Sequence, residues 1–150
     1  FGGHAAAAGL TIAKTHFTEF QQVFTALISS MDEALFQAVL WTDGVLPTED
    51  LQLATVDYLQ NLSPWGQKFP APIFEGHFQV GDYRWLKEVH LKLNLILDNG
   101  QRVDAIAFNA LDRFDFDPTK SHVHLVYELD KNEFNSNVSV QFKVAHLQSV

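Results

Sequence analysis

The second half of the chain alternates between apolar and polar residues, and this alternation constrains the fold more than any other feature. Residues 90–97 read HLKLNLIL, with leucine at every second position. Side chains of a β-strand point alternately to opposite faces, so such a segment forms a strand with one buried and one exposed face. Five segments alternate in this way and are predicted strands: residues 73–80, 90–97, 102–109, 122–129 and 138–146.

The sequences between these segments indicate how the strands connect. Asp98, Asn99 and Gly100 form a strong signal for a hairpin turn between the second and third strands. Residues 110–120, between the third and fourth strands, leave room for a helical turn. Five strands with a wider gap after the third predict an OB-type β-barrel. A small five-stranded sandwich is the structural alternative.

The first 66 residues carry helical signals instead. Apolar residues recur at helical spacing over residues 17–28, and Pro47 is typical of the first position of a second helix that extends to about Asn61. Three short elements are also expected: a helix over residues 5–8 and strands over residues 10–13 and 37–42. The chain is therefore predicted to be an α+β protein, with a mixed N-terminal segment followed by the barrel.

The charge of the chain is negative overall but unevenly distributed. Ten basic and eighteen acidic residues give a formal net charge of −8, which argues against a nucleic-acid-binding protein. Residues 1–66 hold one basic and seven acidic residues, whereas residues 67–150 hold nine basic and eleven acidic residues. The second part is close to neutral, so the charge pattern leaves room there for a local basic face.

Several features narrow the class of protein further. The chain has no cysteine, which excludes disulfides and thiolate zinc sites and fits a reducing cytoplasm. It contains no apolar run near the ~20 residues that a membrane span needs, and its start lacks the basic region of a signal peptide. Because the first residue is Phe1 and not methionine, we expect a piece of a longer protein.

Basic and aromatic residues gather near the first two predicted barrel strands. An exposed aromatic residue beside basic residues is typical of single-strand binding, in which bases stack and phosphates are contacted. The alternative is that Trp85 closes the end of the barrel and the charged residues are simply solvated. The candidate binding residues are Tyr83, Arg84, Trp85 and Lys87 at the bend, and Lys92, Asn94 and Arg102 on the outer face of the second and third strands.

Two further clusters have the residue types of a metal site. His122 and His124 share a strand face, with His90 as a third candidate, but no carboxylate or thiolate stands at ligand spacing, which favours structural histidines. The acidic stretch 112–117 lacks the glycine and the closing glutamate of a calcium loop, which favours a solvated loop held by two buried aromatic residues.

Two separated parts of the sequence resemble known families. Residues 2–9, GGHAAAAG, resemble the GGHxxAAG signature of the DHHA1 domain, which accompanies the DHH domain of metal-dependent phosphoesterases. The segments WTDGVLPTEDL, NLSPWGQKFPAPIFEG, HLKLNLILDNGQRVDAIAFN and YELDKNEFNSNVSVQFKVAH are similar, in this order, to the C-terminal region of the RecJ family of bacterial single-strand-specific DNA exonucleases. One departure is the absence of the family's Gly-Asn pair between Pro64 and Pro70.

The resemblance implies a domain organisation and a parent activity. It implies the end of a DHHA1 domain over residues 1–30, a connecting strand-helix segment over 31–66 and an OB domain over 67–150. The parent is expected to hydrolyse single-stranded DNA from the 5′ end with Mn²⁺ or Mg²⁺, held by Asp and His residues of a DHH domain. No DHH triplet occurs in this chain, so we expect it to hold no metal and to cleave nothing.

The resemblance also implies roles for individual residues. Gly2 and Gly3 would let the backbone approach a phosphate, beside the N-terminus of a following helix, and His4 would contact that phosphate in the intact protein. The OB domain would bind single-stranded DNA and select the strand. The alternative is a protein-interaction module that docks on the nuclease core or on a single-stranded-DNA-binding protein. Neither reading involves a membrane, and both place the protein in the bacterial cytoplasm.

Overall fold

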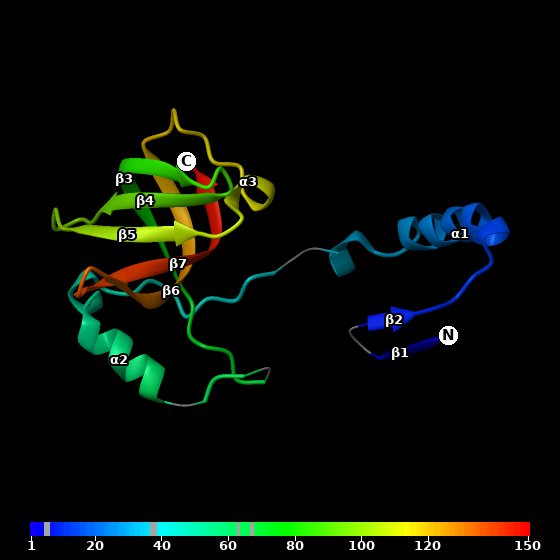
Figure 1. Ribbon diagram of the computed structural model, residues 1–150, viewed down its shortest axis with the longest axis horizontal. Helices are drawn as coiled ribbons and strands as arrows, with labels where there is room; N and C mark the ends of the chain where they lie inside the picture. The colour runs from blue at the N-terminus through cyan, green and yellow to red at the C-terminus, as the bar shows by residue number, and fades with distance from the viewer. Residues whose placement is uncertain (5–6, 37–38, 63, 67) are drawn as a thin grey trace. The chain divides into compact units, whose positions relative to one another are not determined.

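The structure of the chain is a computed structural model that describes residues 1–4, 7–36, 39–62, 64–66 and 68–150. The chain divides into two compact units, Phe1–Leu40 and Trp41–Val150 (Figure 1). The finer predicted division, with boundaries after residues 30 and 66, stays a prediction. In the described part of the chain, no helix has both the length and the apolar character needed to cross a membrane.

The first unit begins with a small hairpin of β1 (Gly2–His4) and β2 (Ala7–Gly9), whose strands are antiparallel. The predicted helix over residues 5–8 is therefore wrong for Ala7 and Ala8, and residues 5 and 6 lie outside the described residues. A run this short cannot offset the cost of nucleating a helix. Small residues let the strands approach closely, since a Cβ added at Gly3 would lie 3.0 Å from the Cβ of Ala8. The predicted strand over 10–13 is also wrong, because these residues are irregular.

The predicted helix over residues 17–28 is confirmed as α1 (Phe17–Ser29). A 3-10 turn, η1 (Lys14–His16), precedes it and another, η2 (Glu33–Phe36), follows it. The rings of Phe20 and Phe24 stack with their centroids 5.7 Å apart. The apolar side chains of Phe17, Val23, Phe24 and Leu27 nevertheless remain exposed in this unit.

The second unit starts with an irregular segment that leads to a helix. The predicted strand over 37–42 is wrong for residues 39–42, which are irregular, and residues 37 and 38 lie outside the described residues. The chain instead pairs a few residues later, where Val45 forms a parallel bridge with Glu75. The helix predicted from Pro47 is divided into η3 (Thr48–Asp50) and α2 (Leu53–Leu62), because Leu51 adopts the non-helical angles φ −76° and ψ 64°.

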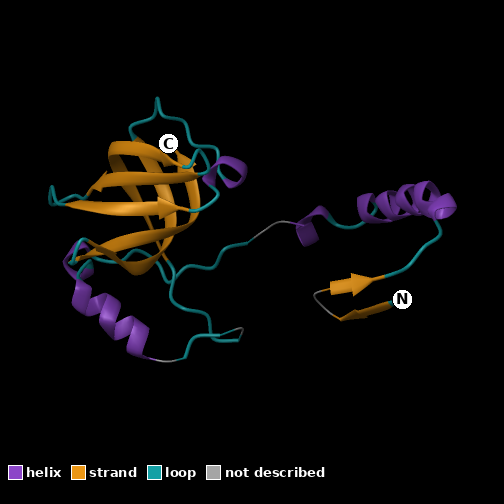
Figure 2. Ribbon diagram, viewed as in Figure 1, coloured by secondary structure: helices purple, strands orange, loops and turns teal. Residues whose placement is uncertain are grey.

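All five predicted barrel strands are confirmed, and they close into one barrel in the order β3-β4-β5-β7-β6 (Figures 1 and 2). The pair β5–β7 is parallel and the other pairs are antiparallel, so the OB-type barrel is confirmed and the sandwich alternative is wrong. A helical turn, α3 (Ala110–Arg113), follows the third strand as expected. The strands are β3 (Phe74–Leu86), β4 (His90–Ile96), β5 (Arg102–Ala107), β6 (His122–Phe134) and β7 (Asn137–Ser149).

The barrel interior is filled by the apolar side of each strand. The rings of Tyr127 and Phe142, both buried, stack at 3.9 Å between centroids, and the ring of Phe78 packs against both. Gly76 makes room for that ring, since a Cβ at this position would lie 2.8 Å from Cζ of Phe78. Burial in a low-dielectric core raises the pKa of the Tyr127 hydroxyl.

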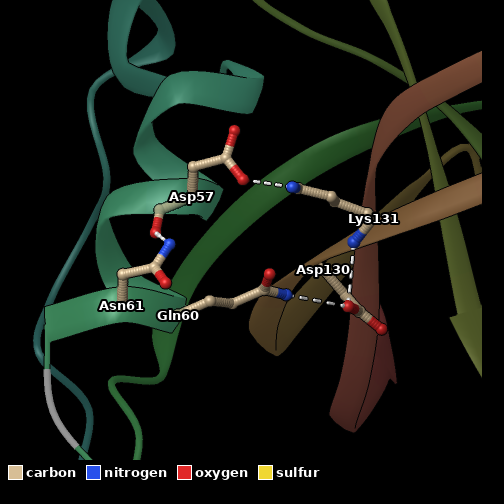
Figure 3. A network of polar contacts seen from close by, with 5 residues as sticks. All are labelled: Asp57, Gln60, Asn61, Asp130 and Lys131. Carbon is tan, nitrogen blue, oxygen red and sulfur yellow. Dashed lines mark hydrogen bonds and ion pairs between the residues drawn. The ribbon is translucent and has the colours of Figure 1, made fainter.

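Helix α2 packs against β6 and β7 and adds to the same core. Its Val56 side chain is completely buried among core residues. Figure 3 shows the polar contacts beside it: Asp57 forms an ion pair with Lys131, and Nε2 of Gln60 donates to Oδ1 of Asp130 at 3.5 Å. Because exposed ion pairs typically contribute only about 0–1 kcal/mol, we attribute the attachment of α2 mainly to Val56 and Leu59, which pack against the core.

Candidate nucleic-acid interface

A bulge at Gly81 determines which residues of β3 face outward. The register shifts between Val80, which pairs with Leu95, and Asp82, which pairs with Asn94. One extra residue in a strand moves all following side chains to the opposite face. The bulge therefore places Asp82 and Arg84 on the outer face of the barrel, meaning the side that points away from the core.

The outer faces of β3, β4 and β5 carry a connected polar network. Nζ of Lys92 lies 2.6 Å from Oδ2 of Asp104, and Nδ2 of Asn94 donates to Oδ1 of Asp104 at 3.0 Å. Nη1 of Arg102 donates to Oδ1 of Asn94 at 2.7 Å. The structure thus brings together the predicted residues Lys92, Asn94 and Arg102. Arg84 lies opposite Lys92 in the register of β3 and β4, on the same face.

Asp104 is the member of this network that the sequence reasoning did not name as a site residue. Burial raises the pKa of its carboxyl, but hydrogen bonds from Lys92 and Asn94 and the charges of Lys92 and Arg84 outweigh that effect and hold the pKa below its usual 3.8. Asp104 is therefore ionised at neutral pH and cancels part of the positive charge. Its position on the outer face, two residues after Arg102, was the signal that could have found it.

Two adjoining hollows lie on this face. The charged pocket has a volume of about 270 Å³ and is lined by Asp82, Tyr83, Arg84, Lys92, Asn94, Arg102 and Asp104. The second, which we call the hairpin pocket, has a volume of about 480 Å³ and extends to the β6–β7 hairpin. Arg84, Lys92 and Asp104 line both pockets, and we call the two pockets together the depression.

The predicted aromatic residues Tyr83 and Trp85 lie on the other side of β3 from Arg84, although Tyr83 also lines the charged pocket. Tyr83 and Trp85 pair with Leu93 and Leu91, which point into the core, so both aromatic side chains are on the inner side of β3. The ring of Tyr83 packs edge-on against Phe116 at 5.2 Å, and about two-fifths of the surface of Tyr83 and of Trp85 is exposed. The single surface expected from Tyr83 to Lys87 is therefore divided, with Arg84 outside, Tyr83 and Trp85 inside, and Lys87 exposed in the turn after β3.

The histidines considered for a metal site each contact different neighbouring residues. His124 stacks on His77, with ring centroids 4.6 Å apart, and its Nε2 lies 3.2 Å from Oε2 of Glu75. His122 contacts Ser121, and Nδ1 of His90 accepts the backbone N–H of Asn109. Among the residues that the structure describes, no three potential ligands of the His, Cys, Asp and Glu types come together in a metal-binding arrangement.

The acidic stretch 112–117 comprises the end of α3 and an irregular segment that leads into a turn at residues 118 and 119. It begins within α3 and ends at Asp117, whose Oδ1 accepts the hydroxyl and the backbone N–H of Thr119. These hydrogen bonds lower the pKa of the Asp117 carboxyl. Phe114 and Phe116 are partly buried and pack against the barrel core. The expectation that aromatic residues hold this loop is therefore confirmed.

The glycine-rich start of the chain differs from the expected geometry. Gly2, Gly3 and His4 form a strand that pairs with residues 7–9, so the described residues after the motif do not provide the helix N-terminus that was expected to favour a phosphate. The contact between His4 and phosphate stays a prediction.

Replacing Asp104 with asparagine is expected to lower the free energy of unfolding by about 0.2–1 kcal/mol at pH 7, since its partly exposed ion pair with Lys92 is lost. The folded-state pKa of Asp104 is lowered, so its contribution is present above about pH 4 and disappears as the pH falls through the folded-state value. Urea unfolding at pH 7 and pH 3 checks this. The exposed turn residue Asp98, replaced in the same way, is the control, and an Asp104→Asn effect that stays constant between the two pH values contradicts the prediction.

Comparison with known proteins identifies the family of the barrel. The family model described as "RecJ OB domain" matches residues 42–146. The chain is 38% identical to the single-stranded-DNA-specific exonuclease RecJ of Haemophilus influenzae, with 100% of this chain and 27% of that protein covered. It is 41% identical to the protein of the same name from Dickeya dadantii, with 98% of this chain and 26% of that protein covered.

The fold agrees with a solved structure. The crystal structure of RecJ in complex with Mn²⁺ from Thermus thermophilus matches with a TM-score of 0.72 and 24% identity, over 99% of this chain and 22% of that one. The chain spans about a quarter of the length of the curated relatives that it resembles. Because the OB domain model matches more than half of the chain, the chain belongs to the RecJ OB domain family.

Proposed function

We propose that the outer face of β3, β4 and β5 binds single-stranded DNA, as the DNA-binding part of a RecJ-type 5′→3′ exonuclease of DNA repair and recombination. The observation that carries this proposal is the gathering of Arg84, Lys92 and Arg102 along one depression. In OB barrels, oligonucleotides bind on the face of the second and third strands, between the loops that follow the first and fourth strands. Here that face is formed by β4 and β5.

The charge of the depression and the availability of unpaired bases both support single-stranded DNA as the ligand. Three basic side chains along one depression can contact successive phosphates, and such contacts release counterions and weaken with salt. Unpaired bases are free to meet protein side chains, whereas bases in a duplex are stacked and paired. The relatives named above are single-strand-specific exonucleases, which fits a domain that selects the strand.

Cleavage is assigned to other parts of a longer protein. The Thermus thermophilus structures contain Mn²⁺ or Mg²⁺, but the described residues of this chain hold no cluster suited to such an ion. Under the proposal the metal-binding residues lie outside this chain, in a bacterial cytoplasmic enzyme. The 150-residue chain then binds DNA without hydrolysing it.

Fluorescence anisotropy of labelled oligonucleotides tests the proposal with the 150-residue chain. We expect binding to the single strand and much weaker binding to a duplex of the same sequence. Three phosphate contacts predict a slope of about −2 in log affinity against log salt, or a loss of about 20-fold between 50 and 200 mM salt. Incubation with Mn²⁺ should leave the oligonucleotide intact. Folded chain that binds no single strand at low salt contradicts the DNA-binding proposal.

A second candidate function is protein docking, and a specific observation favours it. A pocket of about 550 Å³ is lined by the aromatic and proline residues Trp41, Trp65, Phe69, Pro70 and Pro72. Trp41 is 85% exposed and Phe69 57% exposed, which is unusual for such large apolar side chains. Under this alternative the partner is the nuclease core or a single-stranded-DNA-binding protein. Failure of the folded chain to bind DNA would favour this function.

A further inference from the structure

The hairpin pocket differs in chemistry from the charged pocket beside it. Its apolar surface comes from Leu86, Ile106 and Phe134, each on a different strand. Ile106 lies on the outer face, where its neighbours along β5 are Asp104 and Arg102, yet it is only 7% exposed. An apolar floor therefore interrupts an otherwise polar face at this point.

The β6–β7 hairpin holds Phe134 beside this floor. The ladder between the two strands continues without interruption from Tyr127 to Phe134, which pairs with Asn137. Asn135 and Ser136 form the two-residue turn with φ of 50° and 63°, the left-handed angles of a tight hairpin turn. Phe134 is 70% exposed although its backbone is held by this ladder. It therefore presents an aromatic ring to solvent from a well-defined position.

The remaining lining of the pocket is polar and uncharged, apart from the three residues shared with the charged pocket. Asn132, Asn137, Ser139 and Gln141 contribute amide and hydroxyl groups from β6 and β7. An amide side chain offers a donor and an acceptor side by side, which is the pattern on the edge of a nucleobase. The pocket thus combines an aromatic ring, an apolar floor and hydrogen-bonding groups.

We propose that the hairpin pocket holds an unpaired nucleobase stacked on Phe134, while Arg84 and Lys92 contact the adjoining phosphates. This inference rests on the proposed function. It goes further by assigning the base to the hairpin pocket and the phosphates to the basic residues beside it. The pocket is open only to a base that is not paired, so stacking on Phe134 gives the face its preference for single strands. Several amide groups suit more than one base, which predicts little dependence on sequence.

The test is the Phe134→Ala variant of the 150-residue chain, measured with a normal oligonucleotide and with one of equal length that lacks bases. Stacking of one base is worth about 1–3 kcal/mol, so we expect a loss of about 5- to 150-fold for normal DNA. The salt slope should stay unchanged because no phosphate contact is removed. Variant and unsubstituted chain should bind the DNA without bases equally well.

Two further variants serve as controls. Phe134→Tyr keeps an aromatic ring and should retain the affinity of the unsubstituted chain. Val138→Ala shortens another exposed apolar residue of the same hairpin, one that does not line the pocket, and should also bind normally. Circular dichroism of each variant establishes that the barrel remains folded.

The outcomes separate this inference from the proposed function. If the unsubstituted chain binds no single-stranded DNA, the proposed function itself fails. If it binds but Phe134→Ala binds normal DNA equally well, the DNA-binding face stands and the base pocket is wrong. An equal loss of affinity for normal DNA and for DNA without bases also overturns the base pocket, because the ring would then not act through a base.

Discussion

Replacing Phe142 with alanine lowers the free energy of unfolding of the barrel by about 3–5 kcal/mol, the cost typical of deleting a large buried aromatic side chain. The ring of Phe142 is fully buried, stacks on Tyr127 at 3.9 Å and lies 5.3 Å from the ring of Phe78. Its removal leaves a cavity at the centre of the core, where β6 and β7 cannot collapse without breaking their pairing. Urea unfolding followed by far-UV circular dichroism measures the change.

Two further variants serve as controls for this prediction. Phe142→Leu keeps most of the apolar volume, so it should cost clearly less than alanine and remain measurable if the alanine variant does not fold. Phe24→Ala removes a half-exposed ring from α1 in the other unit and should leave the unfolding of the barrel nearly unchanged. Equal effects of Phe142→Ala and Phe24→Ala on the barrel would contradict the central position assigned to Phe142.

Reversing two charges of the depression, in Arg84→Glu combined with Arg102→Glu, is expected to lower the affinity for single-stranded DNA by about 100-fold or more. Hydrogen bonds to charged groups contribute about 1.5–3 kcal/mol each, and both sites would then repel phosphates. Loss of two phosphate contacts should also reduce the salt slope by about 1.4. Anisotropy titrations at several salt concentrations measure both quantities.

The matched control changes the net charge by the same amount at residues that do not line the depression. Lys68 and Lys14 are exposed and lie outside both pockets, so Lys68→Glu combined with Lys14→Glu should reduce the affinity far less. Similar losses in the two double variants would show that only the overall charge matters. Neither pair of substitutions touches the buried core, so thermal unfolding of the barrel should be similar in all chains.

The sequence predicts a barrel strand over the part in which every second side chain is apolar and points into the core. The leucines at positions 91, 93 and 95 predict β4 almost to its ends. Alternation also predicts that the first barrel strand ends at residue 80, but β3 continues to Leu86. Residues 82–86 pair through their backbone with β4, and this pairing requires no apolar side chain. The same reason explains the underestimated lengths of β6 and β7.

The candidate site likewise contains some residues whose positions follow from nearby sequence and others whose positions depend on long-range strand pairing. Lys92, Asn94 and Arg102 were predicted on one face because neighbouring strands joined by a tight turn have a readable register. The separation of Arg84 from Tyr83 and Trp85 follows from alternation, but the choice of face depends on the bulge at Gly81. Nothing in the neighbouring residues of Phe134 indicated that its ring would stand beside Lys92 and Ile106.

Local sequence patterns thus establish the number of barrel strands, the helical turn after the third strand and the family resemblance. These features depend on side chains close together in the chain, where the period of a strand or the residues of a turn suffice. Closure of the barrel, in contrast, pairs β5 with β7 in parallel, across more than thirty residues. Only that long-range pairing brings the β6–β7 hairpin beside β4 and β5, and with it the ring of Phe134 beside the basic residues.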